Sequence, residues 1–382
     1  MREYLLIFVV AAVATYVTAV VAREAATRLD AVAKVRDRDV HATPIPYFGG
    51  IAMLAGLGAA YLVMRELPFL STANEVVFDD AGAVLIGGAL ICVLGVVDDV
   101  FELDALTKFA GQVVAAVVVV AQGVQFLYLP LPGLTGTFVL DPLQAALFSV
   151  LVIVATVNAV NFIDGLDGLA AGVIGIGAAA FFIFAYLLAR ENAQSLAITA
   201  ALLTAALAGA CAGFLPHNFF PARMFMGDSG SMLIGLVLAG SAISLTGQFP
   251  AASVSEGIAG ARATLTPTLL PLILPVAMLI VPLVDLFLAV VRRTRAGRSP
   301  FSPDKMHLHH RLLEIGHSHR RAVLVMYMLA GFVAFGTVWL SLFAGWRSMV
   351  GVAMLAVVTV VATFLLPRWR QTPAGPLGGG RI

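Results

Sequence analysis

Charged residues are scarce in this sequence. Only 12% of the 382 residues are Asp, Glu, Lys or Arg, whereas 60% are hydrophobic, and the mean hydropathy is +0.97. A soluble globular chain carries about 25% charged residues, so roughly half of the usual polar surface is missing. A large soluble core does not explain this deficit, because its surface would still need a polar cover. The composition therefore excludes an ordinary soluble domain.

Cysteine and net charge are also low. The two cysteines, Cys92 and Cys211, both lie in apolar runs, which indicates small core residues rather than a disulfide or a metal pair. The formal net charge is +1, so no strong attraction to nucleic acid is expected. The first apolar run follows Arg2 and Glu3 and has no small-residue cleavage site behind it. We therefore expect a retained membrane span rather than a signal peptide.

Long apolar runs are what the sequence has instead. A helix needs roughly 20 mainly apolar residues to cross the hydrocarbon core, and the runs predict an all-α, polytopic integral membrane protein with about eleven transmembrane helices. They begin near Tyr4, Phe48, Ala81, Phe109, Leu143, Leu169, Ser195, Ser231, Pro267, Ala322 and Ser348. We expect a single membrane domain over residues 1–370 and a disordered cytoplasmic tail over residues 371–382, which is rich in Pro and Gly.

The distribution of positive charge predicts the orientation. If the N-terminus lies outside, 18 of the 23 lysines and arginines fall in cytoplasmic segments and five fall outside. This split follows the positive-inside rule. All seven histidines, which the rule does not use, fall on the cytoplasmic side as well. We therefore predict that the N-terminus is outside, that the C-terminus is cytoplasmic, and that the polar loops face the cytoplasm.

Two adjacent carboxylates, Asp98 and Asp99, end the third predicted span, and Lys108 follows soon after. Carboxylates at an inner helix end can bind a divalent ion or a cationic group. The alternative for this segment alone is an acidic, solvated helix end, because charges in loops are not functional by default.

A second polar segment ends the fifth predicted span and contains Asn158, Asn161, Asp164 and Asp167. The first three recur at every third position, so they would share one broad helix face. Asn and Asp oxygens are ligands that Mg²⁺ prefers, usually together with substrate phosphates. The structural alternative is that the Asn side chains join helices. It does not account for the two Asp-Gly steps, which let the backbone turn and approach a ligand closely.

A third segment, Gly227-Asp228-Ser229-Gly230, opens the eighth predicted span. Glycines beside Asp and Ser at a helix N-terminus suit phosphate binding through free N–H groups and the helix dipole. A plain N-cap is the alternative, because Asp and Ser are favoured there.

A histidine-rich segment lies in the longest predicted inner loop and contains His307, His309, His310 and Arg311. Zinc binding is disfavoured, because no cysteine and no H-E-x-x-H helix joins these histidines. Imidazole and guanidinium donors that face a diphosphate or a sugar fit the composition better.

Together these segments resemble the polyprenyl-phosphate N-acetylhexosamine-1-phosphate transferase family, and within it the bacterial N-acetylglucosamine branch. The segments that carry the resemblance are Pro44-Ile-Pro-Tyr-Phe-Gly-Gly50, Asp98-Asp99, Asn158-x-x-Asn161-x-x-Asp164-Gly-x-Asp167-Gly-Leu, Gly227-Asp228-Ser-Gly and His307-x-His309-His310. Each is weak alone, but five in order on one predicted membrane face are specific. The resemblance covers residues 36–319 and implies an all-helical membrane fold.

The resemblance also implies an activity. A family member of this branch transfers N-acetylglucosamine 1-phosphate from cytosolic UDP-GlcNAc to a membrane polyprenyl phosphate, which is undecaprenyl or decaprenyl phosphate. The products are polyprenyl-diphospho-GlcNAc and UMP, and the reaction initiates a cell-envelope glycan. Mg²⁺ is the implied cofactor, with Mn²⁺ as a substitute. The implied setting is a multi-pass enzyme of the bacterial plasma membrane, with its active site facing the cytoplasm, and a homodimer is compatible with the family.

Expected roles follow from the resemblance and the residue types. Asp228 and Asn161 are the expected Mg²⁺ ligands, and Asp98 and Asp99 are expected beside the incoming lipid phosphate, which Lys108 would hold. The donor diphosphate or its amino-sugar is expected to contact His307, His309, His310 and Arg311, and Asn158 is expected to bind substrate. We expect Asp164 and Asp167 to bind the uridine or to brace the loop.

Three other classes of membrane protein share parts of this pattern. Muramoyl-pentapeptide phosphotransferases share the Asp-Asp and Asn/Asp segments, but the segments at 44–50 and 307–310 resemble the N-acetylglucosamine branch. CDP-alcohol phosphotransferases use a D-G-x-x-A-R pattern, which fails here because Leu166-Asp167-Gly168 follows the first Asp-Gly. A cation-coupled transporter can also use buried acids. Transporters usually place such acids near the midplane on broken helices, whereas the acids of this sequence are predicted at inner helix ends.

Overall fold

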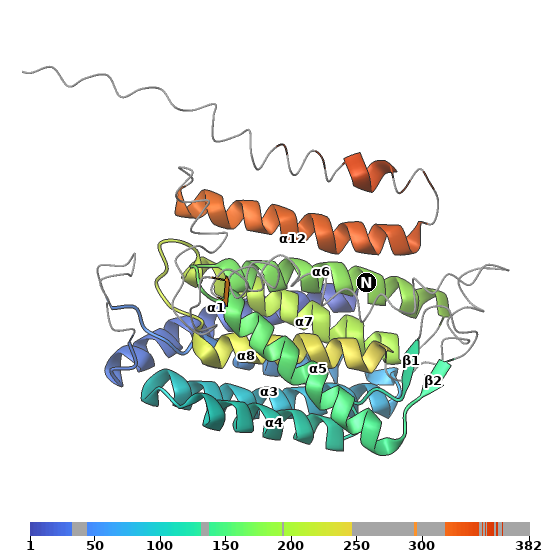
Figure 1. Cartoon of the computed structure of the whole chain (residues 1–382), viewed down its shortest axis with the longest axis horizontal. Coiled ribbons are helices and arrows are strands. Elements are labelled where there is room, and N and C mark those ends of the chain that lie inside the picture. The colour runs from blue at the N-terminus through green and yellow to red at the C-terminus, as the bar shows by residue number, and fades with distance from the viewer. Residues whose placement is uncertain are drawn as a thin grey trace, which may run out of the picture.

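A computed structural model describes residues 1–32, 44–130, 137–192, 195–246, 294–295, 318–343, 346, 348, 350–354, 357 and 361. Helices dominate this part of the chain (Figure 1). The elements are α1 (Arg2–Arg28), α2 (Gly49–Met64), the 3-10 turn η1 (Leu70–Thr72), α3 (Glu75–Phe101), α4 (Ala105–Ala121), β1 (Tyr128–Pro130), β2 (Thr137–Val139), α5 (Pro142–Ile163), α6 (Leu169–Asn192), α7 (Ser195–Asn218), α8 (Gly227–Thr246) and α12 (His319–Leu342). The strands β1 and β2 form a short antiparallel hairpin between α4 and α5.

Seven of the described helices are long and apolar enough to cross a membrane, namely α1, α3, α5, α6, α7, α8 and α12. Two further apolar helices, α2 and α4, are shorter. The chain is therefore an all-α, polytopic membrane protein, as its composition predicts. The count of eleven spans and the orientation stay predictions, and the span expected from Pro267 lies outside the described residues.

Local capping decides where several helices begin. Asn74 Oδ1 accepts a 3.1 Å hydrogen bond from the N–H of Val76, so α3 begins at Glu75 rather than near Ala81. Asp104 caps α4 in the same way, and α4 begins at Ala105 rather than near Phe109. Side-chain acceptors of this kind satisfy N–H groups that have no partner within the helix. The polar first turns therefore extend these two helices beyond their apolar runs.

Helix α8 lies at the centre of the bundle. In its most apolar membrane-spanning stretch, 94% of the residues of α8 are buried inside the protein, compared with 28% in the same kind of stretch of α1. It packs against α2, α3, α5 and α7, while α12 packs against α6 at the upper edge of the view (Figure 1). A residue at the start of α8 is therefore surrounded by other helices, whereas one on α1 or α12 faces the surroundings on one side.

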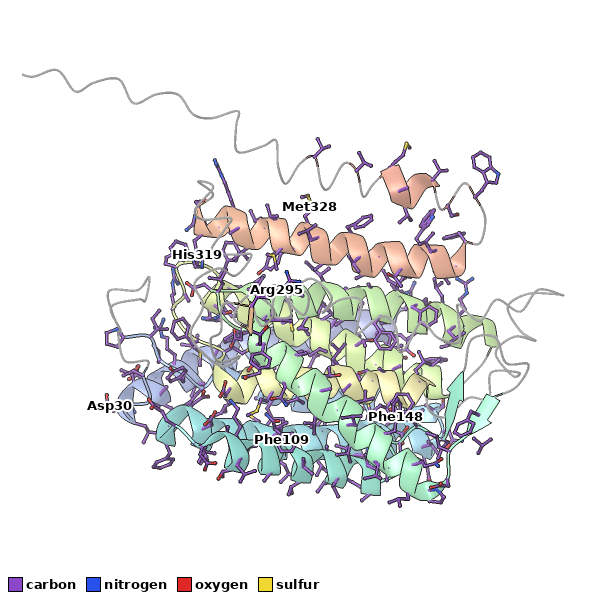
Figure 2. All side chains as sticks on the ribbon, viewed as in Figure 1. Asp30, Phe109, Phe148, Arg295, His319 and Met328 are labelled. Atoms are coloured by element: carbon purple, nitrogen blue, oxygen red, sulfur yellow. The ribbon has the colours of Figure 1, made fainter. Side chains whose placement is uncertain are left out.

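Apolar side chains cover the outer surfaces of the bundle. On α4 and α5 these exposed side chains include Leu106, Phe109, Val114, Leu143 and Leu147, and many of them project along the lower edge of the view in Figure 2. In water this exposure would be costly, but a lipid-facing surface needs no polar cover. The surface thus agrees with the membrane setting.

Candidate active site

Four helix ends meet at one end of the bundle. The last turns of α3 and α5 and the first turns of α4 and α8 place Asp98, Asp99, Asn161, Lys108 and Asp228 within hydrogen-bond reach of one another. We call these five residues the acidic cluster. They come from three separate sequence segments that were expected to act together, and the structure does bring them together.

Lys108 lies between two carboxylates of this cluster. Its Nζ is 2.9 Å from Asp98 Oδ2 and also contacts Asp228 Oδ2. The other oxygen of Asp98 accepts a 2.8 Å hydrogen bond from the N–H of Leu103, just beyond α3. Asp98 is buried, and Lys108 and Asp228 are partly buried. The ammonium therefore neutralises two acids from different helices at a single point.

Asp99, the next residue, has different partners. Its Oδ1 accepts a 2.7 Å hydrogen bond from the N–H of Asp228, and its Oδ2 accepts a 3.3 Å hydrogen bond from the N–H of Ser229. Both donors belong to the first turn of α8, where main-chain N–H groups lack helical partners. The sequence leaves two uses open for these N–H groups, phosphate binding and an ordinary helix cap. In the structure a protein carboxylate accepts from them instead, so Asp99 fixes the start of α8.

Two glycines make this arrangement sterically possible. Gly227 has φ +69°, and a Cβ there would meet the carboxylate of Asp99. A Cβ on Gly95, one turn before Asp99, would meet the backbone of Ser229. Only a residue without a side chain allows α3 and α8 to approach this closely.

Asn161 fixes the side chain of Asp228. Its Nδ2 donates 2.6 Å to Asp228 Oδ1 and 2.9 Å to the Oγ of Ser231. Ser231 in turn donates a 3.0 Å hydrogen bond to the carbonyl of Gly227. The two residues predicted as metal ligands, Asn161 and Asp228, are thus direct neighbours, and Ser231 is a contributor that the sequence interpretation missed.

A second polar layer lies one helical turn deeper, where the predicted site residue Asn158 meets Gln112, which the sequence interpretation missed. Asn158 Nδ2 donates a 2.6 Å hydrogen bond to Gln112 Oε1, and Gln112 Nε2 donates to Asn158 Oδ1 at 3.5 Å and contacts Met232 Sδ at 3.3 Å. Gln112 is buried and lies one turn after Lys108. The available signal was a lone amide in an apolar run, where polar side chains commonly join helices. Asn158 therefore supports the cluster from below.

The Asp-Gly loop (residues 164–168) follows α5. Asp167 is buried, and its Oδ2 accepts a 2.9 Å hydrogen bond from the N–H of Ala222, so it braces the loop. The N–H of Gly168 donates to Asn218 Oδ1 at 3.0 Å, and the hydroxyl of Tyr327 on α12 donates to the Gly168 carbonyl. Two regions distant in sequence, the end of α7 with the residues just after it and α12, thus hold this loop in place.

Asp164, just beyond the end of α5, is partly buried near the acidic cluster. Burial, and then the negative charges of three neighbouring aspartates, raises the pKa of Asp164 to about 8. Near neutral pH this carboxyl is therefore largely protonated when no cation is bound. Because other acids surround it, a positive charge bound nearby would lower the pKa of Asp164 and favour its ionised form.

The proline-glycine segment at residues 44–50 also reaches this end of the bundle. The N–H of Phe225 donates a 2.9 Å hydrogen bond to the carbonyl of Pro46, and the N–H of Gly49 donates to the carbonyl of Phe225 at 3.2 Å. The segment therefore supports the chain just before Gly227. The remaining predicted residues, His307, His309, His310 and Arg311, lie outside the described residues.

The residues of the cluster suit a hard divalent cation. Within the described ranges, no three His, Cys, Asp or Glu side chains are grouped so as to hold a metal by themselves. Mg²⁺ usually binds through one or two carboxylates together with substrate phosphates, so it does not need such a group. The point where Asp98 and Asp228 converge already holds a positive charge, that of Lys108. The cluster therefore fits Mg²⁺ when a phosphate supplies the missing ligands.

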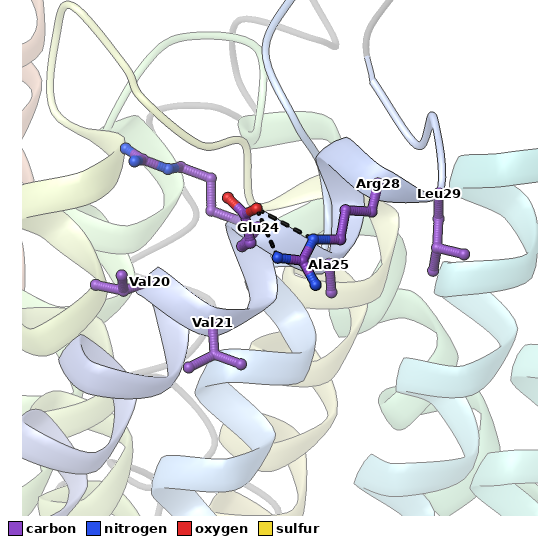
Figure 3. Close-up of a pocket in the computed structure, with 7 residues that line it drawn as sticks. Val20, Val21, Glu24, Ala25, Arg28 and Leu29 are labelled. Atoms are coloured by element: carbon purple, nitrogen blue, oxygen red, sulfur yellow. Dashed lines mark hydrogen bonds and ion pairs between the residues drawn. The ribbon is translucent and has the colours of Figure 1, made fainter.

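An open pocket of about 650 Å³ lies elsewhere, along the last turns of α1 (Figure 3). Its lining includes Val20, Val21, Arg23 and Leu29. Glu24 is its one acid, and Arg28 pairs with that acid at 3.1 Å. None of its residues belongs to the acidic cluster, so the pocket is not where the converging carboxylates lie.

Comparison with known proteins places this geometry in a family. The sequence profile of glycosyl transferase family 4 matches residues 81–246, an interval that contains the whole acidic cluster. A decaprenyl-phosphate N-acetylglucosaminephosphotransferase of Mycobacterium tuberculosis is 48% identical over 377 residues, which cover 97% of this chain and 90% of the relative. The chain belongs to glycosyl transferase family 4.

Other relatives of this family 4 chain are more distant. A probable undecaprenyl-phosphate N-acetylglucosaminyl 1-phosphate transferase of Bacillus subtilis is 32% identical and covers 92% of this chain and 91% of its own length. A phospho-N-acetylmuramoyl-pentapeptide-transferase of Desulforudis audaxviator is also 32% identical, over 76% of this chain and 82% of its own length. The family resemblance drawn from the five motifs is confirmed.

Proposed function

We propose that this chain transfers N-acetylglucosamine 1-phosphate from UDP-GlcNAc to a membrane polyprenyl phosphate, in a reaction that needs Mg²⁺. The products are polyprenyl-diphospho-GlcNAc and UMP, and the step initiates a cell-envelope glycan. The observation that carries the proposal is the convergence of Asp98, Asp228, Asn161 and Lys108 at one end of a membrane bundle. There a water-soluble nucleotide sugar and a lipid phosphate can meet.

The names of the relatives support the choice of substrates. The 48% identical relative is named for decaprenyl phosphate and N-acetylglucosamine phosphate, and the undecaprenyl relative is 32% identical. The higher identity favours a decaprenyl acceptor. It also favours the N-acetylglucosamine branch over the muramoyl-pentapeptide branch, whose relative covers less of this chain.

The chemistry required is mainly charge neutralisation and positioning. An anionic lipid phosphate must approach an anionic diphosphate, and phosphoryl transfer is catalysed chiefly by electrostatic stabilisation. A phosphate monoester has its second pKa near about 6, so at neutral pH it is mostly ionised and needs no strong base. We therefore propose one direct displacement.

The residues of the cluster have distinct roles in this proposal. Asp228 and Asp98 would hold Mg²⁺, with Asn161 orienting Asp228 through the 2.6 Å hydrogen bond. When bound, the ion supplies positive charge to the donor diphosphate. Lys108 would contact a substrate phosphate, and Asp99 would keep the start of α8 in register with α3.

The membrane arrangement is part of the proposal. We place the acidic cluster at the cytoplasmic face of the bacterial plasma membrane, with the N-terminus outside and the C-terminus inside. The charge distribution supports this orientation. In that arrangement the donor arrives from the cytosol and the acceptor diffuses within the membrane.

The test is transfer of radiolabelled sugar from UDP-GlcNAc to decaprenyl phosphate by the purified protein in detergent. We expect label in the organic phase that requires both the lipid and Mg²⁺ and that EDTA abolishes. Asp228→Asn should lose transfer by about 10²-fold or more, as for other preorganised charges at reacting phosphates. Asp141→Asn is the matched control, because Asp141 caps α5 at the end that carries the hairpin, and Asn is an equally good cap.

Two results would contradict the proposal. Undiminished transfer in EDTA would remove the divalent cation from the reaction. Label from no UDP-N-acetylhexosamine, with folded protein and intact lipid acceptor, would remove the transferase activity itself.

A further inference from the structure

The position of Lys108 has a consequence for cation binding. Each of the two carboxylates that Lys108 contacts has its second oxygen fixed by the protein. Asp98 Oδ1 accepts from the N–H of Leu103 at 2.8 Å, and Asp228 Oδ1 accepts from Asn161 at 2.6 Å. The oxygens that remain, both Oδ2, point at the ammonium of Lys108.

A divalent cation that uses both carboxylates must therefore take the place where the ammonium now lies. Two positive centres cannot share that place, because their repulsion in a partly buried site is strong. The lysine side chain can leave without moving its helix, since its charge is carried on a flexible four-carbon stem. Lys108 is only partly buried, so a path away from the carboxylates exists.

We infer that Lys108 is the resident counter-ion of the acidic cluster, and that a divalent cation binds by displacing its ammonium, which is then free to bind a substrate phosphate. This inference rests on the proposed cation site. A bound metal frees the Lys108 ammonium for a substrate phosphate, and a phosphate that holds the ammonium leaves the two carboxylates to the metal. Each ligand therefore tightens the binding of the other by the same factor. The substrate-free protein then holds its metal weakly, because the ammonium of Lys108 already offsets the charge of the two acids.

Metal binding without substrate tests the inference directly. We would titrate Mn²⁺ into the detergent-solubilised full-length protein and follow free Mn²⁺ by electron paramagnetic resonance. Lys108→Met should bind Mn²⁺ about tenfold more tightly than the wild type, because a competing unit charge is gone. Lys108→Arg, which keeps the charge, should show no such gain.

A matched control separates displacement from general electrostatics. Arg223 is exposed and lies five positions before Asp228, and its N–H bonds to the carbonyl of His217. Arg223→Met removes the same charge without touching the carboxylates, and we expect its Mn²⁺ affinity to stay within about twofold of the wild type. Equal tightening in both variants, or none in Lys108→Met, would overturn the inference.

A measurement on the wild type covers the case in which Lys108→Met does not fold. The chain has only three lysines, Lys34, Lys108 and Lys305. Acetic anhydride labelling read by mass spectrometry should become faster at Lys108 when Mg²⁺ is added, relative to the other two. Labelling at Lys108 that slows or stays constant with Mg²⁺ would contradict displacement.

The outcome is separable from that of the proposed function. If EDTA abolishes transfer but Mn²⁺ binds no more tightly to Lys108→Met, the transferase proposal stands and the counter-ion role is wrong. If transfer survives EDTA, the proposed function fails on its own readout, whatever the affinity of Lys108→Met for Mn²⁺.

Discussion

The main-chain N–H of Asp228 donates a 2.7 Å hydrogen bond to Asp99 Oδ1. The preceding residue, Asp98, instead faces the ammonium of Lys108 at 2.9 Å. Two adjacent acids of one motif therefore have different partners: Asp99 fixes the start of α8 to the end of α3, and Asp98 faces Lys108. This division leads to a first prediction.

Asp99→Asn should lower stability more than Asp98→Asn. The amide offers one acceptor in place of two and has no charge, so it cannot accept from both N–H groups of α8. Loss of a hydrogen bond to a charged group costs about 1.5–3 kcal/mol. Thermal melting in detergent should show a lower midpoint for Asp99→Asn, whereas Asp98→Asn should lose transfer with a smaller change in melting. Equal loss of stability in the two variants would argue against the division of roles.

Gly95→Ala should damage both the fold and the site. Its new Cβ would meet the backbone of Ser229, which cannot move without displacing α8. Overpacking of this kind costs about 1–3 kcal/mol. We expect a lower melting midpoint together with reduced transfer, because Asp228 precedes Ser229.

Gly58→Ala is the matched control for that substitution. Gly58 also lies within a helix, α2, and a Cβ there would meet nothing within 4 Å. Alanine in a helix is favoured over glycine by about 0.5–1 kcal/mol, so this variant should be neutral or slightly more stable. Similar melting curves for the two variants would show that the close approach of α3 and α8 is not limiting.

Gln112→Leu tests the second polar layer. The substitution removes the hydrogen bonds that Gln112 exchanges with the amide of Asn158, whose Nδ2 keeps its 2.8 Å bond to the carbonyl of Val154. Each hydrogen bond lost costs about 0.5–1.5 kcal/mol. The double variant Gln112→Leu, Asn158→Leu removes both amides and should recover part of that loss. Melting midpoints for the two single variants and the double variant form a double-mutant cycle. Strictly additive effects would mean that the two amides do not support each other.

The raised pKa of Asp164 predicts how the stability of the folded protein depends on pH in the absence of divalent cations. Burial and the charges of neighbouring aspartates raise the pKa of Asp164 from its ordinary value of 3.8 to about 8 in the folded protein. The folded state thus binds this proton more tightly than the unfolded state, so stability from this group is lost as pH rises from about 4 to about 8. Asp164→Asn cannot ionise and should escape that loss.

The measurement compares melting of the wild type and Asp164→Asn at pH 5 and pH 9 in EDTA. We expect a higher midpoint for the variant at pH 9 and a smaller difference at pH 5, where less of the stability has been lost. Mg²⁺ should reduce the difference at pH 9, because positive charge stabilises the ionised carboxylate. A variant that melts below the wild type at pH 9 would contradict the assignment.

The length of apolar runs was enough to predict most helices. α6 and α7 begin at Leu169 and Ser195, where the runs begin. α3 and α4 begin earlier, because the caps Asn74 and Asp104 add a polar first turn that hydropathy does not detect. The run length does not reveal which helices are neighbours, so the central position of α8 could not be predicted.

The same limit applies to the site. Successive spans cross the membrane in alternating directions, and from this the sequence predicts that Asp98, Asn161 and Asp228 lie at one end of the bundle. The structure places them together there. The partners of each side chain depend on how α3, α4, α5 and α8 pack together. For that reason neither the capping of α8 by Asp99 nor the position of Gln112 could be predicted, and the expected place of Asp99 beside the lipid phosphate stays a prediction. The roles of the cluster in catalysis stay predictions.

The contact between Tyr327 and Gly168 joins residues that are 159 positions apart in the chain. A ribosome adds roughly 5–20 residues per second, so the Asp-Gly loop is made roughly 8–30 s before the helix that supports it. Asp228, the last acid of the cluster along the chain, is also added before Tyr327. Biosynthesis therefore finishes this end of the enzyme late, and a ribosome that stalls before α12 leaves the loop without its last hydrogen-bond donor.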